Sequence, residues 1–177
     1  MSNPANILDT ALMGLKWRNA GQACISANRV YVQSGVYEKF AAILKDRTSK
    51  LVVGHGSDKA STIGPVTTPA SLDRLSKQVQ DAKGHGARIL LGGDRIKSET
   101  GFFVQPTIIA DATSKMLVTR EESFAPVLAI YRFDSEQEVI ELANNTPVSS
   151  TVFSSTHMHR LTATFRWVWL PTPSLRI

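Results

Sequence analysis

Residues 16–32 read KWRNAGQACISANRVYV, a polar run that passes through Cys24 and ends in a strand-like segment. An isolated cysteine is more often a small buried apolar residue than a nucleophile. Here, however, a polar loop with Gly21 close by would give a thiolate both access and backbone N–H groups that face a developing oxyanion. Arg18 would favour an anion nearby, either the thiolate or a substrate. These residues alone leave both interpretations of Cys24 open.

The segments around this stretch predict alternating helices and strands. Apolar residues at helical spacing follow Ser2-Asn3-Pro4. Helices are also predicted from Ser34 to about Lys50, from Thr68-Pro69 to Gly84, and after the capping box of Ser135 and Glu138. We expect the first of these to bury Val36, Phe40, Ile43 and Leu44, and the second to bury Leu72, Leu75, Val79 and Ala82. Residues 54–68 form a predicted loop, and strands are predicted at 29–33, 88–91, 102–109, 127–133 and 151–153. The pattern favours an α/β layered domain with a largely parallel sheet.

Composition excludes several classes of protein. The content of 42% hydrophobic and 20% charged residues is that of an ordinary globular domain. Three arginines after residue 150, in a segment without acidic residues, carry most of the formal charge of +5, so no basic nucleic-acid surface is indicated. No stretch approaches the roughly 20 apolar residues of a membrane helix. The single cysteine excludes an internal disulfide and fits a reducing compartment, so we expect a cytoplasmic protein, with a mitochondrial location left open.

Two blocks of the sequence carry a resemblance to a known family. Residues 16–32 resemble the cysteine signature of the aldehyde dehydrogenase superfamily and, among its branches, look most like succinate-semialdehyde dehydrogenases. Downstream, Arg120-Glu121-Glu122-Ser123-Phe124-Ala125-Pro126-Val127 is similar to the family's Glu-Glu-x-Phe-Gly-Pro motif, with Ala125 in place of the glycine. Landmarks in the family's order lie between and after them: Gly64-Pro65, Gly92-Gly93, Phe103-Val104-Gln105-Pro106-Thr107 and Ala143-Asn144-Asn145-Thr146. The resemblance covers residues 1–155, which we interpret as a segment of the catalytic domain.

The resemblance implies a role for four residues. Cys24 would attack an aldehyde to form a thiohemiacetal, and hydride transfer to NAD or NADP would leave a thioester that water hydrolyses. The backbone N–H of Cys24 would contribute to the oxyanion hole. Glu122 corresponds to the glutamate that binds the nicotinamide ribose, and Phe124 to the aromatic residue that packs against the nicotinamide. Arg18 corresponds to the arginine that binds the distal carboxylate of the substrate in the succinate-semialdehyde branch, although a loop arginine bound to backbone carbonyls is an equal alternative.

Parts of the family's pattern are missing from this sequence. It has no Glu-Leu-Gly-Gly block to supply a general base, no dinucleotide-binding half, and no closing oligomerisation strand, although the family is homo-oligomeric. We interpret residues 156–177 as a tail that does not match the family and expect it to be poorly ordered. His157 and His159 within it have no acidic or cysteine neighbour and predict no metal site.

Two function classes therefore compete. One is an oxidoreductase that acts on a small-molecule aldehyde with NAD or NADP. The other is a non-catalytic remnant or interaction module. We favour it for the chain in isolation because the general base and the dinucleotide-binding half are absent. A cysteine hydrolase that pairs Cys24 with His55 or His85 lacks a convincing position for its base.

Overall fold

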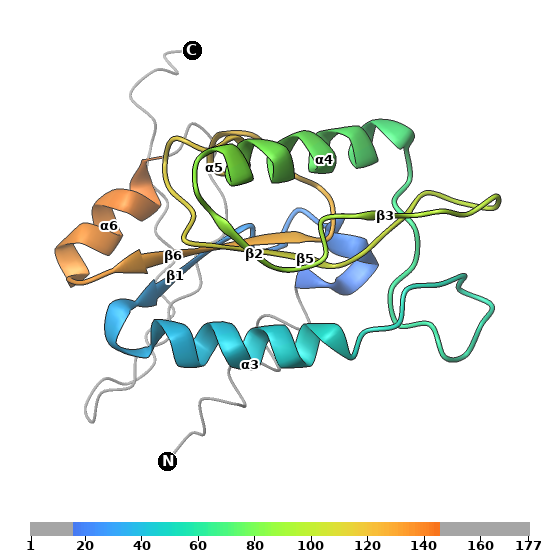
Figure 1. The fold of residues 1–177 in the computed structure, drawn as a ribbon, viewed down its shortest axis with the longest axis horizontal. Coiled ribbons are helices and arrows are strands. Elements are labelled where there is room, and N and C mark those ends of the chain that lie inside the picture. Colours follow the sequence, from blue (N-terminus) through green and yellow to red (C-terminus); the bar gives the residue numbers. More distant parts are fainter. Residues whose placement is uncertain (1–15, 146–177) are drawn as a thin grey trace, which may run out of the picture.

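A computed structural model describes residues 16–145 as a mixed α/β domain around a four-stranded sheet (Figure 1). The strands of this sheet are β1 (Arg29–Gln33), β6 (Val127–Phe133), β5 (Thr107–Ala110) and β2 (Arg88–Leu91), in that order. The short strands β3 (Arg95–Ile96) and β4 (Phe103–Val104) form a separate antiparallel pair. The helices are η2 (Arg18–Gly21), η3 (Ser34–Val36), α3 (Tyr37–Ser49), α4 (Pro69–Gly84), α5 (Leu117–Arg120) and α6 (Glu136–Asn144).

Strand β6 is the centre of the sheet. It pairs in parallel with β1 on one side and with β5 on the other, whereas β2 runs antiparallel to β5. Its first five residues are all buried, as expected for a strand covered on both faces. The predicted fold class, a layered α/β domain with a largely parallel sheet, is confirmed.

Helices α3 and α4 cover opposite faces of the sheet (Figure 1). The N-cap of α4 is Thr68, whose hydroxyl accepts a hydrogen bond from the Ser71 N–H at 3.3 Å, and Pro69 occupies the first turn. The four side chains predicted to face the core are all buried: Leu72, Leu75, Val79 and Ala82. Local capping signals and helical spacing were therefore sufficient to place this helix.

Two predictions in the remaining helices and strands are wrong in detail. Val36 is 54% exposed, because residues 34–36 form a 3-10 turn and α3 begins at Tyr37, which takes the core position instead. The strand expected over 102–109 is divided into β4 and β5 at Gln105-Pro106, since proline has no N–H to donate to a strand ladder. Strand β3 and helix α5 were not predicted. The helix expected after Pro4, the strand expected at 151–153 and the tail from residue 156 lie outside the described residues.

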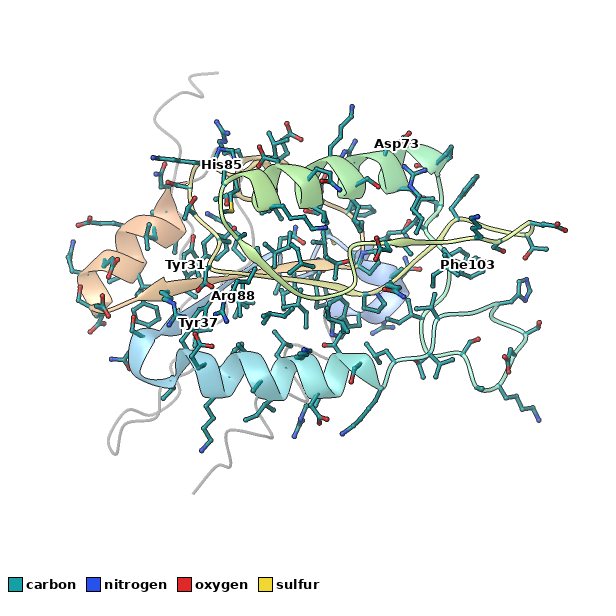
Figure 2. The ribbon with its side chains drawn as sticks, viewed as in Figure 1. Tyr31, Tyr37, Asp73, His85, Arg88 and Phe103 are labelled. Carbon is teal, nitrogen blue, oxygen red and sulfur yellow. The ribbon has the colours of Figure 1, made fainter. Side chains whose placement is uncertain are left out.

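A hydrogen-bonded tyrosine fixes α3 to the sheet. The buried Tyr37 hydroxyl donates to the Ile130 carbonyl at 3.2 Å and accepts from the Asp111 N–H at 2.7 Å. Burial raises the pKa of Tyr37 to about 12, so the hydroxyl stays protonated at neutral pH. The Arg132 guanidinium lies 3.7 Å from the centre of the Tyr37 ring, and Arg88 bridges Asp111 and Glu38 beside it (Figure 2). The two hydrogen bonds of the Tyr37 hydroxyl thus join α3 to β6 and to the end of β5.

Helix α6 is held at both of its ends by side chains. The Ser135 hydroxyl accepts from the Glu138 N–H at 3.3 Å and so provides the predicted N-cap. At the other end, the Tyr31 hydroxyl donates to the Leu142 carbonyl at 3.0 Å, and Arg29 donates to the Ala143 carbonyl at 3.4 Å. Strand β1 thus supplies donors for carbonyls that the last turn of a helix leaves without partners.

The tyrosine contacts give a prediction about stability. Tyr37→Phe should lower the free energy of unfolding by about 2 kcal/mol, because it leaves the part-buried Asp111 N–H without its partner and leaves the Ile130 carbonyl with only its bond from the Ala112 N–H. Tyr31→Phe is the matched control and should cost about 1 kcal/mol or less, since its acceptor lies at a half-buried helix end. Urea unfolding followed by circular dichroism measures both. Equal losses in the two variants would contradict the role assigned to Tyr37.

Candidate active site

The parallel pairing of β1 and β6 brings two loops to the same edge of the sheet. Arg29 pairs with Ala129, so the segment that precedes β1 and the segment that precedes β6 enter the sheet from the same end. The first segment, residues 17–27, contains Cys24 and is called the cysteine loop here. The second, residues 121–126, contains Glu122 and Phe124.

Direct backbone packing joins the two loops. Gly21 has a φ of +73°, and a Cβ placed on it would lie 2.3 Å from the Ala125 carbonyl oxygen. No side chain fits in that space, so glycine is required by both its conformation and its close approach. Ala125 itself is fully buried and has no positive φ, so the backbone conformation at this position does not require glycine. The loop that bears Phe124 therefore rests on the base of the cysteine loop.

The base of the cysteine loop carries backbone strain. Asn19 and Ala20 adopt φ values of 50° and 54°, in the left-handed region. Asparagine tolerates this conformation because its side chain can bond locally, and here the Asn19 amide donates to the Gln22 carbonyl at 2.9 Å. Ala20 has no such compensation, and its methyl group is buried. Strain of this kind persists only where the surroundings over-determine the conformation, and it clusters at functional sites.

Gln22 is the tether between this loop and the segment around Thr67. Its buried side-chain oxygen accepts from the Thr67 N–H at 2.9 Å and from the Thr67 hydroxyl at 3.0 Å. Its side-chain nitrogen donates to the Asn19 carbonyl at 3.0 Å and to the Pro65 carbonyl at 3.4 Å. Both ends of the amide are satisfied, which fixes the loop two residues before Cys24.

Cys24 lies on an exposed turn above these contacts. The Ser26 N–H donates to the Ala23 carbonyl at 3.0 Å and closes a turn with Cys24 and Ile25 at its centre. The Cys24 thiol is free and exposed, and Ile25 beside it is 46% exposed. Within residues 16–145, no hydrogen bond engages the Cys24 backbone N–H. The turn therefore presents a thiol next to an available backbone donor, the two groups that attack on a carbonyl needs.

The other predicted site residues are also exposed. Arg18 lies in η2, at the start of the same loop, and Glu122 lies on the adjoining loop. Phe124 is 37% exposed and has a φ of 40°, a left-handed conformation that is uncommon for an aromatic residue. Within residues 16–145, no hydrogen bond or ion pair joins these side chains to one another or to Cys24. The structure places them in two adjoining loops. The charged groups of Arg18 and Glu122 and the ring of Phe124 are exposed and available to a ligand.

Lys16 is a feature of this site that the sequence analysis did not single out. Its side chain is fully buried, and its Nζ donates to the Asn28 Oδ1 at 2.7 Å. Burial lowers the pKa of Lys16 from 10.5 to about 7. Its position in the sequence, between Leu15 and Trp17, was the available signal: a cation among apolar residues just before a polar loop. Groups of histidine, cysteine and acidic residues that could hold a metal do not occur in residues 16–145, and His157 and His159 lie outside them.

Known proteins share both the sequence and this architecture. The family model described as "Aldehyde dehydrogenase family" matches residues 5–167. The chain belongs to the aldehyde dehydrogenase family. The proposed domain boundary near residue 155 stays a prediction.

Curated relatives of this family member include succinate-semialdehyde dehydrogenases. Succinate-semialdehyde dehydrogenase [NADP(+)] GabD of Escherichia coli is 42% identical over 142 residues, which is 78% of this chain and 29% of that protein. Succinate-semialdehyde dehydrogenase [NADP(+)] 2 of Schizosaccharomyces pombe is 39% identical over 134 residues, or 76% of this chain and 27% of that protein. The solved succinate-semialdehyde dehydrogenase from Burkholderia pseudomallei superposes with a TM-score of 0.77 at 36% identity, over 81% of this chain and 30% of that one. The chain spans less than a third of the length of these relatives.

No helix among residues 16–145 is long and apolar enough to cross a membrane.

The close contact at Gly21 predicts a strong effect of a single methyl group. Gly21→Ala should lower the free energy of unfolding by about 3 kcal/mol, because the new Cβ meets backbone atoms that cannot move aside cheaply. Gly84→Ala is the matched control, since a Cβ there meets nothing within 4 Å and alanine favours the helix. Thermal unfolding of both variants measures the difference. If Gly21→Ala unfolds at the temperature of the unmutated chain, the two loops do not touch as described.

Burial of Lys16 predicts a pH-dependent gain in stability on its removal. Between pH 7 and 10.5 the unfolded chain binds a proton at Lys16 that the folded chain does not. The free-energy cost of burying the charged amine is therefore complete below pH 7 and disappears as pH rises to 10.5. Lys16→Met should therefore raise the free energy of unfolding by about 1–3 kcal/mol below pH 7 and by little above pH 10.5. Lys50→Met, at an exposed lysine, should change it little at either pH. Urea unfolding across this pH range measures both, and a gain that grows with pH would contradict the assignment.

Proposed function

We propose that this chain supplies the nucleophilic cysteine of an NAD(P)-dependent aldehyde dehydrogenase that acts on a small acid-bearing aldehyde such as succinate semialdehyde. The observation that carries this proposal is the exposed turn at Cys24, seated on a strained loop that packs directly against the loop of Glu122 and Phe124. A free thiol in this setting fits a reducing compartment, and we propose the cytoplasm.

The reaction on Cys24 follows from the chemistry of an aldehyde. The thiolate attacks the carbonyl carbon and forms a thiohemiacetal, while the Cys24 backbone N–H donates to the developing oxyanion. Oxidation of this adduct gives a thioester on Cys24, and water then releases the acid and regenerates the thiol. The overall balance is aldehyde, water and oxidised cofactor to acid, reduced cofactor and a proton.

The loop of residues 121–126 fits one end of a nicotinamide cofactor. Glu122 offers an exposed carboxylate that can accept hydrogen bonds from ribose hydroxyls, and Phe124 offers an exposed ring for packing against a flat heterocycle. When bound, NAD or NADP would accept the hydride. The two residues hold only the nicotinamide end, so the proposal assigns the rest of the cofactor to parts of the protein outside this segment.

Arg18 provides a charge for the substrate's second group. Its exposed guanidinium lies in η2 at the start of the cysteine loop and can bind a carboxylate through two parallel hydrogen bonds. This chemistry selects an aldehyde with an acidic far end, and it agrees with the succinate-semialdehyde names of the relatives.

The proposal is tested by protection of Cys24. The purified chain is treated with iodoacetamide at neutral pH, and alkylation of Cys24 is followed by mass spectrometry with and without succinate semialdehyde. We expect alkylation to slow at saturating aldehyde because the thiol is masked as an adduct. Alkylation at an unchanged rate would overturn the proposal. Formation of NADH or NADPH that Cys24→Ser abolishes would extend the proposal to the complete oxidation.

Arg18 is tested with a matched pair of aldehydes. Arg18→Met should weaken protection by succinate semialdehyde by roughly tenfold, because a charged hydrogen bond is lost. Protection by butanal, which has the same carbon chain without the carboxylate, should stay the same. Equal losses for both aldehydes would show that Arg18 supports the loop and does not bind the carboxylate.

A further inference from the structure

Lys16 and Asn28 lie at the two ends of the cysteine loop and bind each other. The Nζ–Oδ1 distance is 2.7 Å. Asn28 is itself fixed to the sheet, since its carbonyl accepts from the Ala129 N–H of β6 at 3.3 Å. The contact therefore ties the start of the loop to the point where the chain enters the sheet. We call this contact the Lys16–Asn28 clasp.

A lysine at this buried position costs free energy, because its amine is removed from water. Lys16 is fully buried, and no acidic side chain of residues 16–145 forms an ion pair with it. Burial alone accounts for the lowered pKa of the amine, about 7. An unbranched apolar side chain of similar length would fill the same space without the cost of removing an amine from water. Packing therefore does not explain a lysine at this position, whereas its bond to Asn28 does.

The strained residues Asn19 and Ala20 lie between Lys16 and the next tether, Gln22. Left-handed backbone at a non-glycine residue relaxes unless its flanks are fixed. Gln22 fixes one flank through Pro65 and Thr67, and the clasp fixes the other. Trp17 is buried in the core and Gly21 packs against the Ala125 carbonyl, so these contacts would remain without the clasp. The hydrogen bond that ties the start of the loop to Asn28 would be lost.

We propose that Lys16 is a positioning residue for Cys24, which holds the strained base of the cysteine loop in place through its bond to Asn28. This inference rests on the proposed role of Cys24 as the nucleophile. Lys16 acts through the loop and has no contact with substrate in the proposal.

The test is a double-mutant cycle with two measurements on the purified chain. The variants are Lys16→Met, Asn28→Leu and the double variant. Asn28→Asp retains an acceptor for the amine, and Lys50→Met is a matched control at an exposed lysine. The first measurement is amide hydrogen exchange in residues 17–27, with β5 as the internal reference. The second is the concentration of succinate semialdehyde that half-protects Cys24 from iodoacetamide.

We expect each single variant to speed exchange in residues 17–27 and to raise the half-protecting concentration about fivefold, the effect of one net hydrogen bond. The double variant should raise the half-protecting concentration no more than either single variant does, because both substitutions remove the same hydrogen bond. Asn28→Asp and Lys50→Met should retain the original values. The thermal midpoint of Lys16→Met should stay the same or rise, so that the loop loosens while the whole domain does not.

Three results would overturn the inference. They are unchanged protection in Lys16→Met, additive losses in the double variant, and a fall in thermal midpoint that parallels the loss of protection. The third would show that Lys16 only supports the fold. If the unmutated chain shows no protection by aldehyde, the proposed role of Cys24 fails, and this inference fails with it. Exchange in residues 17–27 then still reports whether the clasp itself exists.

Discussion

The parallel pairing of β1 with β6 is the interaction on which the rest of the structure depends. Its register, with Arg29 opposite Ala129, places the two preceding loops side by side and allows Gly21 to pack against the Ala125 carbonyl. The same two strands anchor α3 through the Ile130 carbonyl and α6 through Tyr31. A register shift of one residue would turn every side chain of β1 to the opposite face of the sheet and would break all of these contacts at once.

Three energetically unfavourable features of the domain lie in or beside the cysteine loop. Two non-glycine residues in the left-handed region, Asn19 and Ala20, and a fully buried lysine lie within a few residues of each other. At the far end of the sheet, Asp111 also has a left-handed φ of 57°, but its carboxylate is paired with two arginines and its N–H donates to the Tyr37 hydroxyl. A protein accepts strain and desolvation where the geometry serves another purpose, and Cys24 is the group that this loop presents.

Local signals in the sequence predicted much of the fold. Strands β1, β2 and β6 have the predicted bounds, and α4 begins and ends where its cap and glycine indicated. The two wrong predictions also have local causes. Val36 lies in a 3-10 turn that periodicity does not distinguish from a helix, and Pro106 interrupts an otherwise continuous apolar run.

The site was predictable only in part. Cys24, Arg18, Glu122 and Phe124 were named from motifs, whereas their neighbourhood depends on strand pairing across about a hundred residues of chain. The tethers that hold the loop, from Gln22 to Thr67 and from Lys16 to Asn28, are side-chain contacts that no short sequence pattern encodes. A glutamine in a polar run is ordinarily solvated, and the apolar neighbours of Lys16 indicate burial but do not indicate Asn28 as its partner.

The central claim is that this loop makes Cys24 an aldehyde-reactive nucleophile. The most direct measurement is carbon NMR of the purified chain with succinate semialdehyde that is isotope-labelled at its aldehyde carbon. We expect a protein-bound resonance of a tetrahedral, sulfur-substituted carbon in the unmutated chain and its absence in Cys24→Ala. Identical spectra for the two proteins would show that Cys24 does not add to the aldehyde.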